Sequence, residues 1–520
     1  MSTEINAKLF PIPSQFALSL PSQQAGIITS RAWPGVSPSS TETLRRILSD
    51  NHNKWHTFFN DRMFHNHIPH AALTLWCLGA DPSILEASYK QTSTYQRHFF
   101  TSPGPITREN WRDHLGDENY YASYLQFMKE EFENKDMAEM LEEYVLAASA
   151  NHIENVQSQP QMLARYLEGA IHPLIHAGFG IEFGVPGVFL EGKYCLLHAT
   201  FGLFIEVFSI GLAQAAVHPS PCGAVIPRAW FDNGNGKDLA QRFSTAVEVS
   251  GKPQDVHAFT IVARLVGDKR ITPPQAGGDV ITIYTDVMNM HGDAIAKYVG
   301  EWTLEGDLTR KVEELLWTQT LIYGVGGLEV TGGYNADFFL MHLVTSSLFL
   351  PTTFPLLKRS SQIRLLRSYF SVSLAWYIAR GRPALNIKAF FSNPNSLVPT
   401  APGPHPTPNK VAQPAPDSPS AITPNAWLQI IQSTLVHPDD HVCKLQRALA
   451  EYGALWGHIG KGYFKGTELK DAELIDGTLF IRTAGLTAGR VGWVREGEPQ
   501  LTESTAWDYR GFFPAVRAKA

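Results

Sequence analysis

The sequence predicts a mainly α-helical protein, and three observations carry that prediction. Apolar residues recur three and four positions apart along most of the 520 residues, which is the spacing of one helix face. The segment 39–59 begins with a Ser/Thr cap and continues with this spacing. Strand-like pieces are rare and lie between glycines in 476–501. We therefore expect a large helical domain and a small mixed part at the C-terminus.

Further segments of the large domain also have helical patterns. Residues 119–155 have the pattern of two amphipathic helices with acidic outer faces. The other segments expected to be helical are 161–183, 311–327 and 361–381.

Composition divides the chain into three expected parts. Residues 1–396 form the helical domain that holds the candidate site. Residues 397–427 are dense in Pro, Ala and Ser, which cannot bury a core, so we expect a flexible loop or linker. Residues 428–520 are expected to pack on the main domain as a shorter helical region, 428–465, followed by the tail.

Charge and cysteine content narrow the class of protein. The net charge is −6, from 43 Lys and Arg against 49 Asp and Glu, and basic residues are not clustered, so we expect no nucleic-acid partner. Four cysteines are scattered without a CxxC motif, which suits a reducing compartment and no cysteine-based zinc site. The first residues lack the pattern of a secretory signal. These features predict a cytoplasmic protein.

Two apolar stretches, 194–217 and 338–357, reach the roughly 20 residues that a membrane span needs. Each carries a histidine, the first also contains Glu206, and the second contains two prolines. Basic flanks are missing as well. We interpret both stretches as buried core helices and expect no membrane span.

Several motifs of known chemistry are missing. No GxGxxG follows a strand pattern, so a dinucleotide site is poorly supported and no flavin is expected. The glycine-rich segment 324–333 has the wrong spacing, and neither a P-loop nor GxSxG occurs. No histidine stands three residues after a glutamate, which excludes the Glu-x-x-His signature of di-iron helices.

Histidines inside apolar helical segments are the positive signal. His67 and His70, in "HNHIPH", are three apart, and His172 and His176, in "HPLIH", are four apart, so each pair shares a helix face. His342 stands alone among apolar neighbours. Neutral imidazole is the commonest transition-metal ligand, and three such helices could surround iron, copper or zinc. For each histidine the alternative is a hydrogen-bonded core residue.

The other histidines are expected to have ordinary roles. We expect His65 to point outward or to cap a helix, with structural roles for His198, His218, His257 and His291 and surface positions for His405, His437, His441 and His458. A metal held by neutral imidazoles alone in a dry core needs a compensating anion. Glu168 and Glu182 are candidates, and a buried Lys388, converted to a carbamate by carbon dioxide, is another.

Motifs spread over about residues 50 to 500 resemble the fungal questin-oxidase-like family. They include "HNHIPHAALTLWCLGADPSILEASY", "GAIHPLIHAGFGIEFG", "DFFLMHLVTSSLFL", "ARGRP" and "LIDGTLFIRTAGLTAGRVGWVREGE". The resemblance implies an oxygenase of aromatic polyketide pathways. Members open a ring of an anthraquinone with O2 by Baeyer–Villiger type cleavage, with NADPH named as the reductant.

The resemblance also implies a site. At least one member looks like a non-haem iron oxygenase with four histidines and a carboxylated lysine. Carried onto this chain, the expected metal ligands are His67, His70, His172, His176, His342 and Lys388, with His70, His176 and His342 as catalytic residues. The choice between His67 and His70 stays open. Residues 187–206 look inserted beside "HPLIH" relative to the family pattern.

Two other hypotheses stay open. A metal-free oxygenase would use the histidines as general bases with NADPH. A non-catalytic helical protein would bind or hand on polyketide intermediates. In every case the expected partner is a flat aromatic small molecule in an apolar pocket, for which Trp76, Phe179 and Phe339 are candidate lining residues.

Overall fold

The computed structural model describes residues 33–132, 134–184, 208–232, 255–274, 278–329, 333–393, 399–498, 501 and 507–513. Within these ranges no residue belongs to a strand, and isolated bridges such as that between Asp337 and Asp508 are the β-type pairings. The expected mainly α fold is confirmed. The apparent insertion at 187–206 lies outside the described residues.

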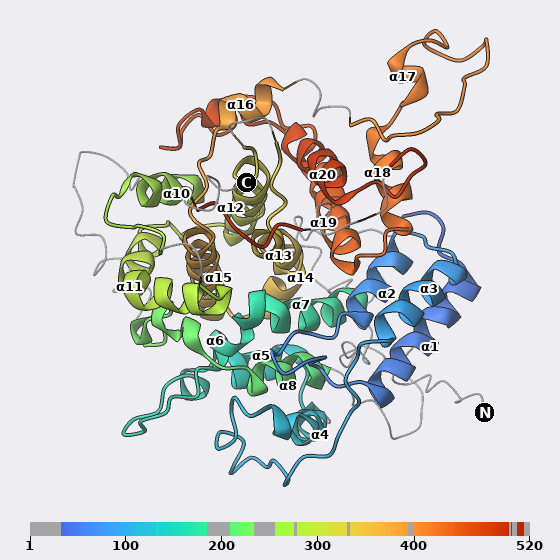
Figure 1. Cartoon of the computed structure of the whole chain (residues 1–520). Coiled ribbons are helices and arrows are strands. Elements are labelled where there is room, and N and C mark those ends of the chain that lie inside the picture. The colour runs from blue at the N-terminus through green and yellow to red at the C-terminus, as the bar shows by residue number, and fades with distance from the viewer. Residues whose placement is uncertain are drawn as a thin grey trace.

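The N-terminal half contributes the helices at the bottom and on the right of Figure 1 and α7 near the centre. Its α-helices are α1 Pro38–Lys54, α2 Ile68–Cys77, α3 Pro82–Ser93, α4 Tyr121–Phe132, α5 Met137–Leu141, α6 Met162–Tyr166, α7 Glu168–Phe183 and α8 Phe208–Val217. The sequence explains how α1 begins. The Ser37 side chain accepts from the Ser40 backbone N–H in a capping box, and Pro38 occupies the first turn.

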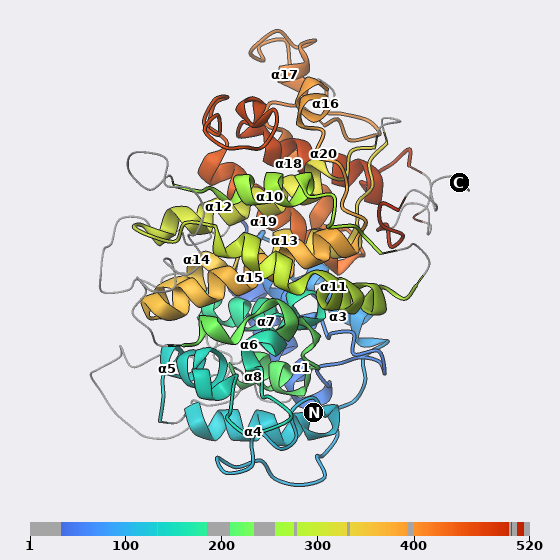
Figure 2. The same cartoon turned by 90° about the vertical axis from the view of Figure 1, so that its left-hand side faces the viewer.

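The second half supplies the rest of the core and its upper layer (Figure 2). Its α-helices are α10 Ala258–Gly267, α11 Val280–Gly300, α12 Leu308–Thr320, α13 Phe338–Ser347, α14 Leu350–Thr353, α15 Arg359–Ala379, α16 Ile387–Ser392, α17 Pro419–Ile422, α18 Ala426–Leu435, α19 Asp440–Trp456 and α20 Thr478–Val491. Shorter 3-10 and π turns connect them, among them η7 Phe354–Leu356. The helices expected within 119–155, 161–183, 311–327, 361–381 and 428–465 are present.

One hydrophobic core joins the described parts of the chain, from Leu44 near the start to Phe513 near the end. Helix α19, from the C-terminal region, packs against α2 and α13, and α13 also packs against α7. Segments far apart in sequence therefore meet at one place inside the molecule. The Pro-rich segment carries the short helix α17, is largely exposed, and projects from the body (Figure 1).

The prediction of strand-like pieces in 476–501 is wrong, because 478–491 form helix α20. Leu479, Phe480, Thr483 and Ala484 lie on its buried face at helical spacing. Gly485 is inside this helix, where a β-carbon would lie 2.5 Å from Pro399. The glycines thus reflect close packing rather than strand ends.

The apolar stretch at 338–357 is a core element. The helical run Phe338–Leu356 is long and apolar enough to cross a membrane, but 83% of its most apolar window is buried inside the protein. This run also carries His342, which is 1% exposed. The burial accounts for its apolar composition without a bilayer.

Candidate metal centre

Histidines from distant parts of the chain gather in one buried cluster. Its members are His65, His67, His70, His172, His176, His218, His342 and His441, and each is 9% exposed or less. They come from the chain entering α2 and from α2 itself, α7, the end of α8, α13 and α19. The predicted convergence of the α2, α7 and α13 histidines is what the structure shows: the rings of His172 and His342 lie 4.8 Å apart.

Local sequence sets the entry into α2. His67 stands at the N-cap of this helix and Pro69 occupies its first turn, where a missing N–H costs nothing. The Asn66 side chain accepts from the Ile68 backbone N–H at 3.0 Å and donates to Asn51 at 2.8 Å. These bonds fix the turn that presents His67 and His70 to the interior.

Helix α7 begins with an unusual turn directly before His172. Gly169, Ala170 and Ile171 have φ values of 55°, 55° and 68°, in the left-handed region that costs non-glycine residues roughly 1–2 kcal/mol each. Gly169 also touches its neighbours, since a β-carbon there would lie 2.6 Å from His65 Cε1. The turn brings the Gly169 carbonyl onto His172 Nδ1. Strained backbone of this kind is typical of functional sites.

Four histidines have their Nδ1 atoms occupied by oxygen acceptors. His67 Nδ1 lies 2.8 Å from Asp440 Oδ2, an ion-pair contact, and His172 Nδ1–H donates to the Gly169 carbonyl. His342 Nδ1–H donates to the Phe338 carbonyl at 2.7 Å. The fourth, His441, donates its Nδ1–H to Asp439 Oδ1 at 3.1 Å, and the same nitrogen lies 2.9 Å from Asp440 Oδ1. Because carbonyls and carboxylates can only accept, each Nδ1 must carry the proton.

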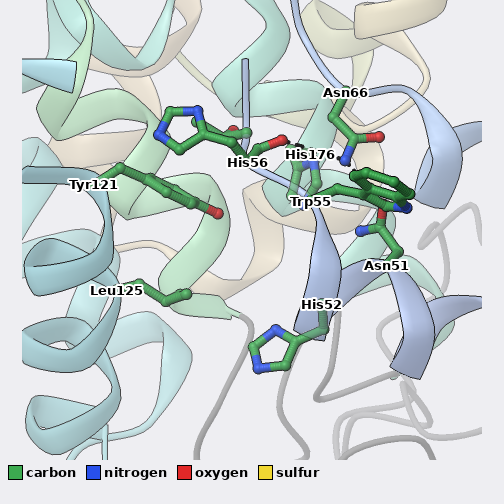
Figure 3. Close-up of a pocket in the computed structure, with 9 residues that line it drawn as sticks. Asn51, His52, Trp55, His56, Asn66, Tyr121, Leu125 and His176 are labelled. Carbon is green, nitrogen blue, oxygen red and sulfur yellow. Dashed lines mark hydrogen bonds between the residues drawn. The ribbon is translucent and has the colours of Figure 1, made fainter. Parts of the chain in front are cut away.

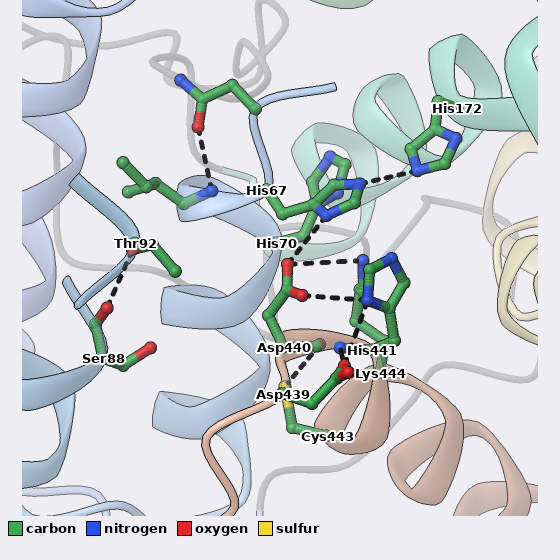
Figure 4. Close-up of polar contacts among 12 residues, drawn as sticks. His67, His70, Ser88, Thr92, His172, Asp439, Asp440, His441, Cys443 and Lys444 are labelled. Carbon is green, nitrogen blue, oxygen red and sulfur yellow. Dashed lines mark hydrogen bonds and ion pairs between the residues drawn. The ribbon is translucent and has the colours of Figure 1, made fainter. Parts of the chain in front are cut away.

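The opposite nitrogens of these four rings are therefore the candidate ligand atoms. His67 Nε2 and His172 Nε2 lie 2.7 Å apart (Figure 4). The Nε2 atoms of His342 and His441 are buried without a hydrogen-bond partner among the described residues. In its neutral form each of these rings offers a bare lone pair at Nε2. The His441 ring centroid lies 4.6 Å from that of His67 and 5.3 Å from that of His342.

The electrostatics favour neutral imidazoles at His67, His172 and His342, whereas the carboxylates of Asp440 and Asp439 outweigh burial and raise the pKa of His441. Burial lowers the pKa of His67 to about 4 and holds the pKa values of His172 and His342 well below the usual range. Burial alone would raise the pKa of Asp440, but His441, His67 and Lys444 hold it well below its ordinary value. Asp440 is thus the ionised carboxylate of the cluster.

This donor set fits a transition-metal ion. Two bare lone pairs facing each other at 2.7 Å repel unless a cation lies beside them. Imidazole nitrogens bind such metals at about 2.1 Å, so two adjacent ligands of one ion lie about 3 Å apart. Ligand atoms of His67, Asp440 and His441 also lie within 4.8 Å of one another. A carboxylate that orients a ligating imidazole through Nδ1 is the usual outer support of such sites.

His70 and His176, both predicted ligands, pair with each other beside these four rings. His70 Nε2 lies 2.9 Å from His176 Nδ1, and the His70 ring stacks on Phe179 at 5.0 Å. His70 Nδ1 and His176 Nε2 are buried without a partner among the described residues. When both rings are neutral, one of these two outer nitrogens carries a proton and the other has a lone pair that can take a ligand or a proton.

His176 borders a small hollow (Figure 3). Its other lining residues are Asn51, His52, Trp55, His56, Thr57, Asn66, Tyr121 and Leu125. The hollow has room for about one water-sized molecule. It is too small for a polycyclic ring system. Of the expected lining residues, Phe179 packs on His70 instead, and Phe339 stacks on Trp376 at 5.1 Å.

The expectations for His65 and His441 are wrong, since both are buried in the cluster, where His218 also lies. His65 Nε2 and His218 Nε2 lie 2.7 Å apart, and the His65 ring stacks on His172 at 4.0 Å. Neither Glu168 nor Glu182, the two glutamates expected as candidates for the compensating anion, pairs with a cluster histidine among the described residues. Glu168 accepts from the Cys222 backbone N–H at 2.8 Å, and Glu182 forms an ion pair with Arg447.

The expectation of a buried Lys388 is also wrong. Lys388 is exposed on the short surface helix α16. A lysine that does lie at the cluster is Lys444, which is 4% exposed. Its Nζ is 3.9 Å from Asp440 Oδ2, beyond hydrogen-bonding distance, and burial lowers its pKa. The signal in the sequence was "DDHVCK", with a histidine and a lysine three apart behind two carboxylates.

Comparison with known proteins gives a consistent result. The family described as questin oxidase-like matches residues 64–449. A Baeyer–Villiger monooxygenase of Cryptosporiopsis sp. is 30% identical over 402 residues, covering 73% of this chain and 78% of that protein. A Baeyer–Villiger oxidase of Pestalotiopsis fici is 27% identical, covering 67% and 71%. The questin oxidase of Aspergillus terreus is 23% identical, covering 81% and 82%.

Proposed function

Because the chain belongs to the questin oxidase-like family, whose relatives are named oxidases and monooxygenases, we propose a specific reaction for this oxidoreductase. It opens a ring of an anthraquinone-type aromatic polyketide by O2-dependent, Baeyer–Villiger type cleavage. The names of the relatives support the reaction type. The substrate class follows from the questin oxidase among them.

In this proposal the cofactor is a non-haem iron ion. The single observation that carries it is the arrangement of His67, His172, His342 and His441, whose Nδ1 protons all point at oxygen atoms. Each ring thereby leaves its Nε2 available as a ligand atom, and the centroids of neighbouring rings lie 4.6–5.3 Å apart. Iron bound there would supply the means of activating O2, which no side chain of the chain can do alone.

The surrounding residues have defined tasks in this proposal. Asp440 fixes the tautomers of His67 and His441 and balances the positive charge. Lys444 replaces Lys388 as the proposed carboxylated lysine. Its burial favours the neutral amine that reacts with carbon dioxide, and the resulting carbamate would add a second anion to the ligand set.

His70 and His176 are proposed to move protons between the cluster and the hollow beside His176. Their 2.9 Å contact joins the cluster to the hollow beside His176. A proton taken at His176 Nε2 would be balanced by one given at His70, with the shared hydrogen between them moving in the same direction. NADPH is proposed as the reductant, although the sequence has no dinucleotide fingerprint.

Two measurements on purified full-length protein test the function. Bound iron is quantified after anaerobic reconstitution, and an anthraquinone panel is incubated with and without O2 and NADPH, with products read by mass. We expect about one equivalent of iron, set by the four-histidine site, and ring-opened products only where both O2 and NADPH are present. Turnover in the presence of a strong chelator would contradict the proposed role of the iron ion. Tight quinone binding without O2 uptake would overturn the oxygenase.

The control is the pair His172→Ala and His437→Ala. His172 belongs to the cluster, whereas His437 lies at the start of the segment that leads into α19 and accepts from the Asp439 backbone N–H through Nδ1. Loss of iron and turnover is expected for the first variant and not for the second. Full turnover by His172→Ala would contradict the proposed site.

A further inference from the structure

Trp507 returns from the C-terminal tail to the edge of the histidine cluster. It is 3% exposed, and its Nε1–H donates to Asp439 Oδ2 at 3.0 Å. The other oxygen of the same carboxylate, Oδ1, lies 3.1 Å from His441 Nδ1. A continuous chain of hydrogen bonds therefore connects the candidate ligand His441, through Asp439, to an indole.

We propose that Trp507 is an electron donor to the metal centre, with Asp439 as the acceptor of the indole proton and Tyr509 as the exit to the surface. This inference rests on the proposed iron site. Indole and phenol are the side chains that lose single electrons most readily, and each loses a proton when it does so. Asp439 Oδ2 already accepts that proton's hydrogen bond, so the proton can move without rearrangement of the protein.

The aromatic path continues from Trp507 toward solvent. The Trp507 and Phe338 ring centroids lie 6.5 Å apart, and those of Phe338 and Tyr509 lie 4.7 Å apart. Tyr509 is 56% exposed. The Phe338 ring centroid also lies 4.8 Å from that of His342 and 4.7 Å from that of His441. Phe338 therefore contacts both the histidine cluster and Tyr509 at the surface.

The backbone holds this tail segment in place. Asp508 pairs with the start of α13 through two bonds: the Phe338 N–H donates to the Asp508 carbonyl at 3.0 Å, and the Asp508 N–H donates to Ala336 at 2.9 Å. Arg380 donates to the Tyr509 carbonyl at 2.8 Å and pairs with Asp337, the N-cap of α13. Residues 507–509 are therefore anchored to the helix that carries His342.

The reaction can be balanced with hydrogen peroxide as the oxidant and no organic substrate. Trp507 loses one electron and the Nε1 proton, and Tyr509 loses one electron and its hydroxyl proton. The peroxide O–O bond breaks, and these two electrons and two protons convert it to two molecules of water. In turnover, Trp507 and Tyr509 would reduce the oxidant formed at the site when no quinone is bound. This reduction would protect the ligating histidines from oxidation.

Trp302 provides a matched internal control. It is 1% exposed, and its Nε1–H donates to a buried carboxylate, Glu314 Oε2, at 2.8 Å. That carboxylate also accepts from Lys311 Nζ at 2.7 Å and from the Ala258 backbone N–H at 2.9 Å. Each indole is thus buried and donates to a carboxylate, with the Asp439 side chain 34% exposed and that of Glu314 9% exposed. Among the described residues, Glu314 pairs with Lys311 and not with a cluster histidine.

The test treats iron-loaded full-length protein with one equivalent of hydrogen peroxide in the absence of quinone. Samples are frozen for electron paramagnetic resonance and digested for peptide mass spectrometry. We expect at least about tenfold more oxidation at Trp507 than at Trp302, a rate ratio that corresponds to about 1.4 kcal/mol. Trp507→Phe should keep its iron and lose the indole radical signal, and Asp439→Asn should weaken that signal.

The outcomes separate this inference from the proposed function. Bound iron with equal oxidation of Trp507 and Trp302 would overturn the electron-donor role alone. Failure to bind iron would overturn both proposals. The wild-type peptide ratio needs no substitution, so it decides the question even if Trp507→Phe folds poorly.

Discussion

His67 and His172 face each other through Nε2 atoms that are 2.7 Å apart, although 105 residues separate them in the chain. Neither nitrogen has a proton to offer, because Asp440 takes the Nδ1–H of His67 and the Gly169 carbonyl takes that of His172. A turn of left-handed residues positions His172, and the buried carboxylate of Asp440 positions His67. A cation at this place relieves the repulsion, which is why Asp440, His441 and Lys444 are expected to affect metal binding.

The first prediction concerns Asp440. Asp440→Asn removes the anion and disturbs the Nδ1 contacts of His67 and His441, so metal affinity should fall by about 10–100-fold. Iron titration monitored by calorimetry measures this change. The control is Asp307→Asn, since Asp307 caps α12 through the Thr309 N–H at 2.9 Å, away from the cluster. Equal affinities in the two variants would show that Asp440 does not support a metal ligand.

The second prediction concerns His441, which the sequence assigned to the surface. His441→Ala should remove one ligand atom and reduce bound iron well below one equivalent, because Nε2 of this ring is buried and has no hydrogen-bond partner among the described residues. The far-ultraviolet circular dichroism of the variant should match that of the wild type. A variant with full iron content would remove His441 from the ligand set and leave it a partner of Asp440 only.

The third prediction concerns the turn before His172. Gly169→Ala places a β-carbon 2.6 Å from His65 Cε1 and 2.8 Å from His218 Cε1, at φ 55°. We expect a loss of about 2 kcal/mol or more in the free energy of unfolding, from backbone strain and overpacking. Urea unfolding measures it.

The matched control for that turn is Gly489→Ala, inside α20. No atom lies within 4 Å of a β-carbon built at Gly489, so alanine should stabilise the helix by up to about 1 kcal/mol. If both variants had the same stability, the left-handed turn would not be a constraint on the protein.

The sequence allowed part of this site to be predicted, for a physical reason. The spacing of His67 with His70 and of His172 with His176 follows from helix geometry, which is local. Which nitrogen of each ring faces inward depends on the Asp440 and Gly169 oxygens, and periodicity carries no information about them. His441 looked exposed because it follows the Pro-rich segment, yet α19 packs between α2 and α13.

The lysine illustrates the same limit. Lys388 and Lys444 both have apolar neighbours in sequence. Lys388 lies on a six-residue helix at the surface, where its side chain reaches solvent. Lys444 lies on the buried face of a 17-residue helix. Burial of one long side chain is decided by the elements that pack around it, so the immediate sequence could not distinguish the two.

The fourth prediction follows from this correction. If Lys444 is carboxylated, iron uptake should depend on dissolved carbon dioxide, and reconstitution with carbon-13 bicarbonate should give a carbamate signal by nuclear magnetic resonance. Lys444→Ala should lose both, with partial recovery of iron binding by added formate or acetate. Lys388→Ala should behave as the wild type. A carbamate-free protein with full iron would mean that Lys444 acts as a cation beside Asp440.

The fifth prediction concerns stability against acid in the metal-free protein. Burial lowers the pKa of His67 to about 4 and that of His218 to about 3, against about 6.5 in the unfolded chain. Below pH 6.5 the unfolded chain binds protons that the folded chain refuses, so the free energy of unfolding falls as the pH drops from 6.5 toward 4. The loss is of the order of 3 kcal/mol for each such histidine.

The contribution of His441 to the pH dependence of the free energy of unfolding has the opposite sign. Burial alone would lower its pKa, but Asp440 and Asp439 raise it above its usual value, so its contribution is present below pH 6.5 and fades as the pH rises through the raised pKa. The lowered histidines outnumber it, and the net slope is a loss of stability in acid. Urea unfolding at pH 7 and pH 5 measures this slope, and His218→Gln should make it shallower. A pH-independent stability over this range would mean that the folded and unfolded chains bind equal numbers of protons, which would contradict the lowered pKa values of His67 and His218.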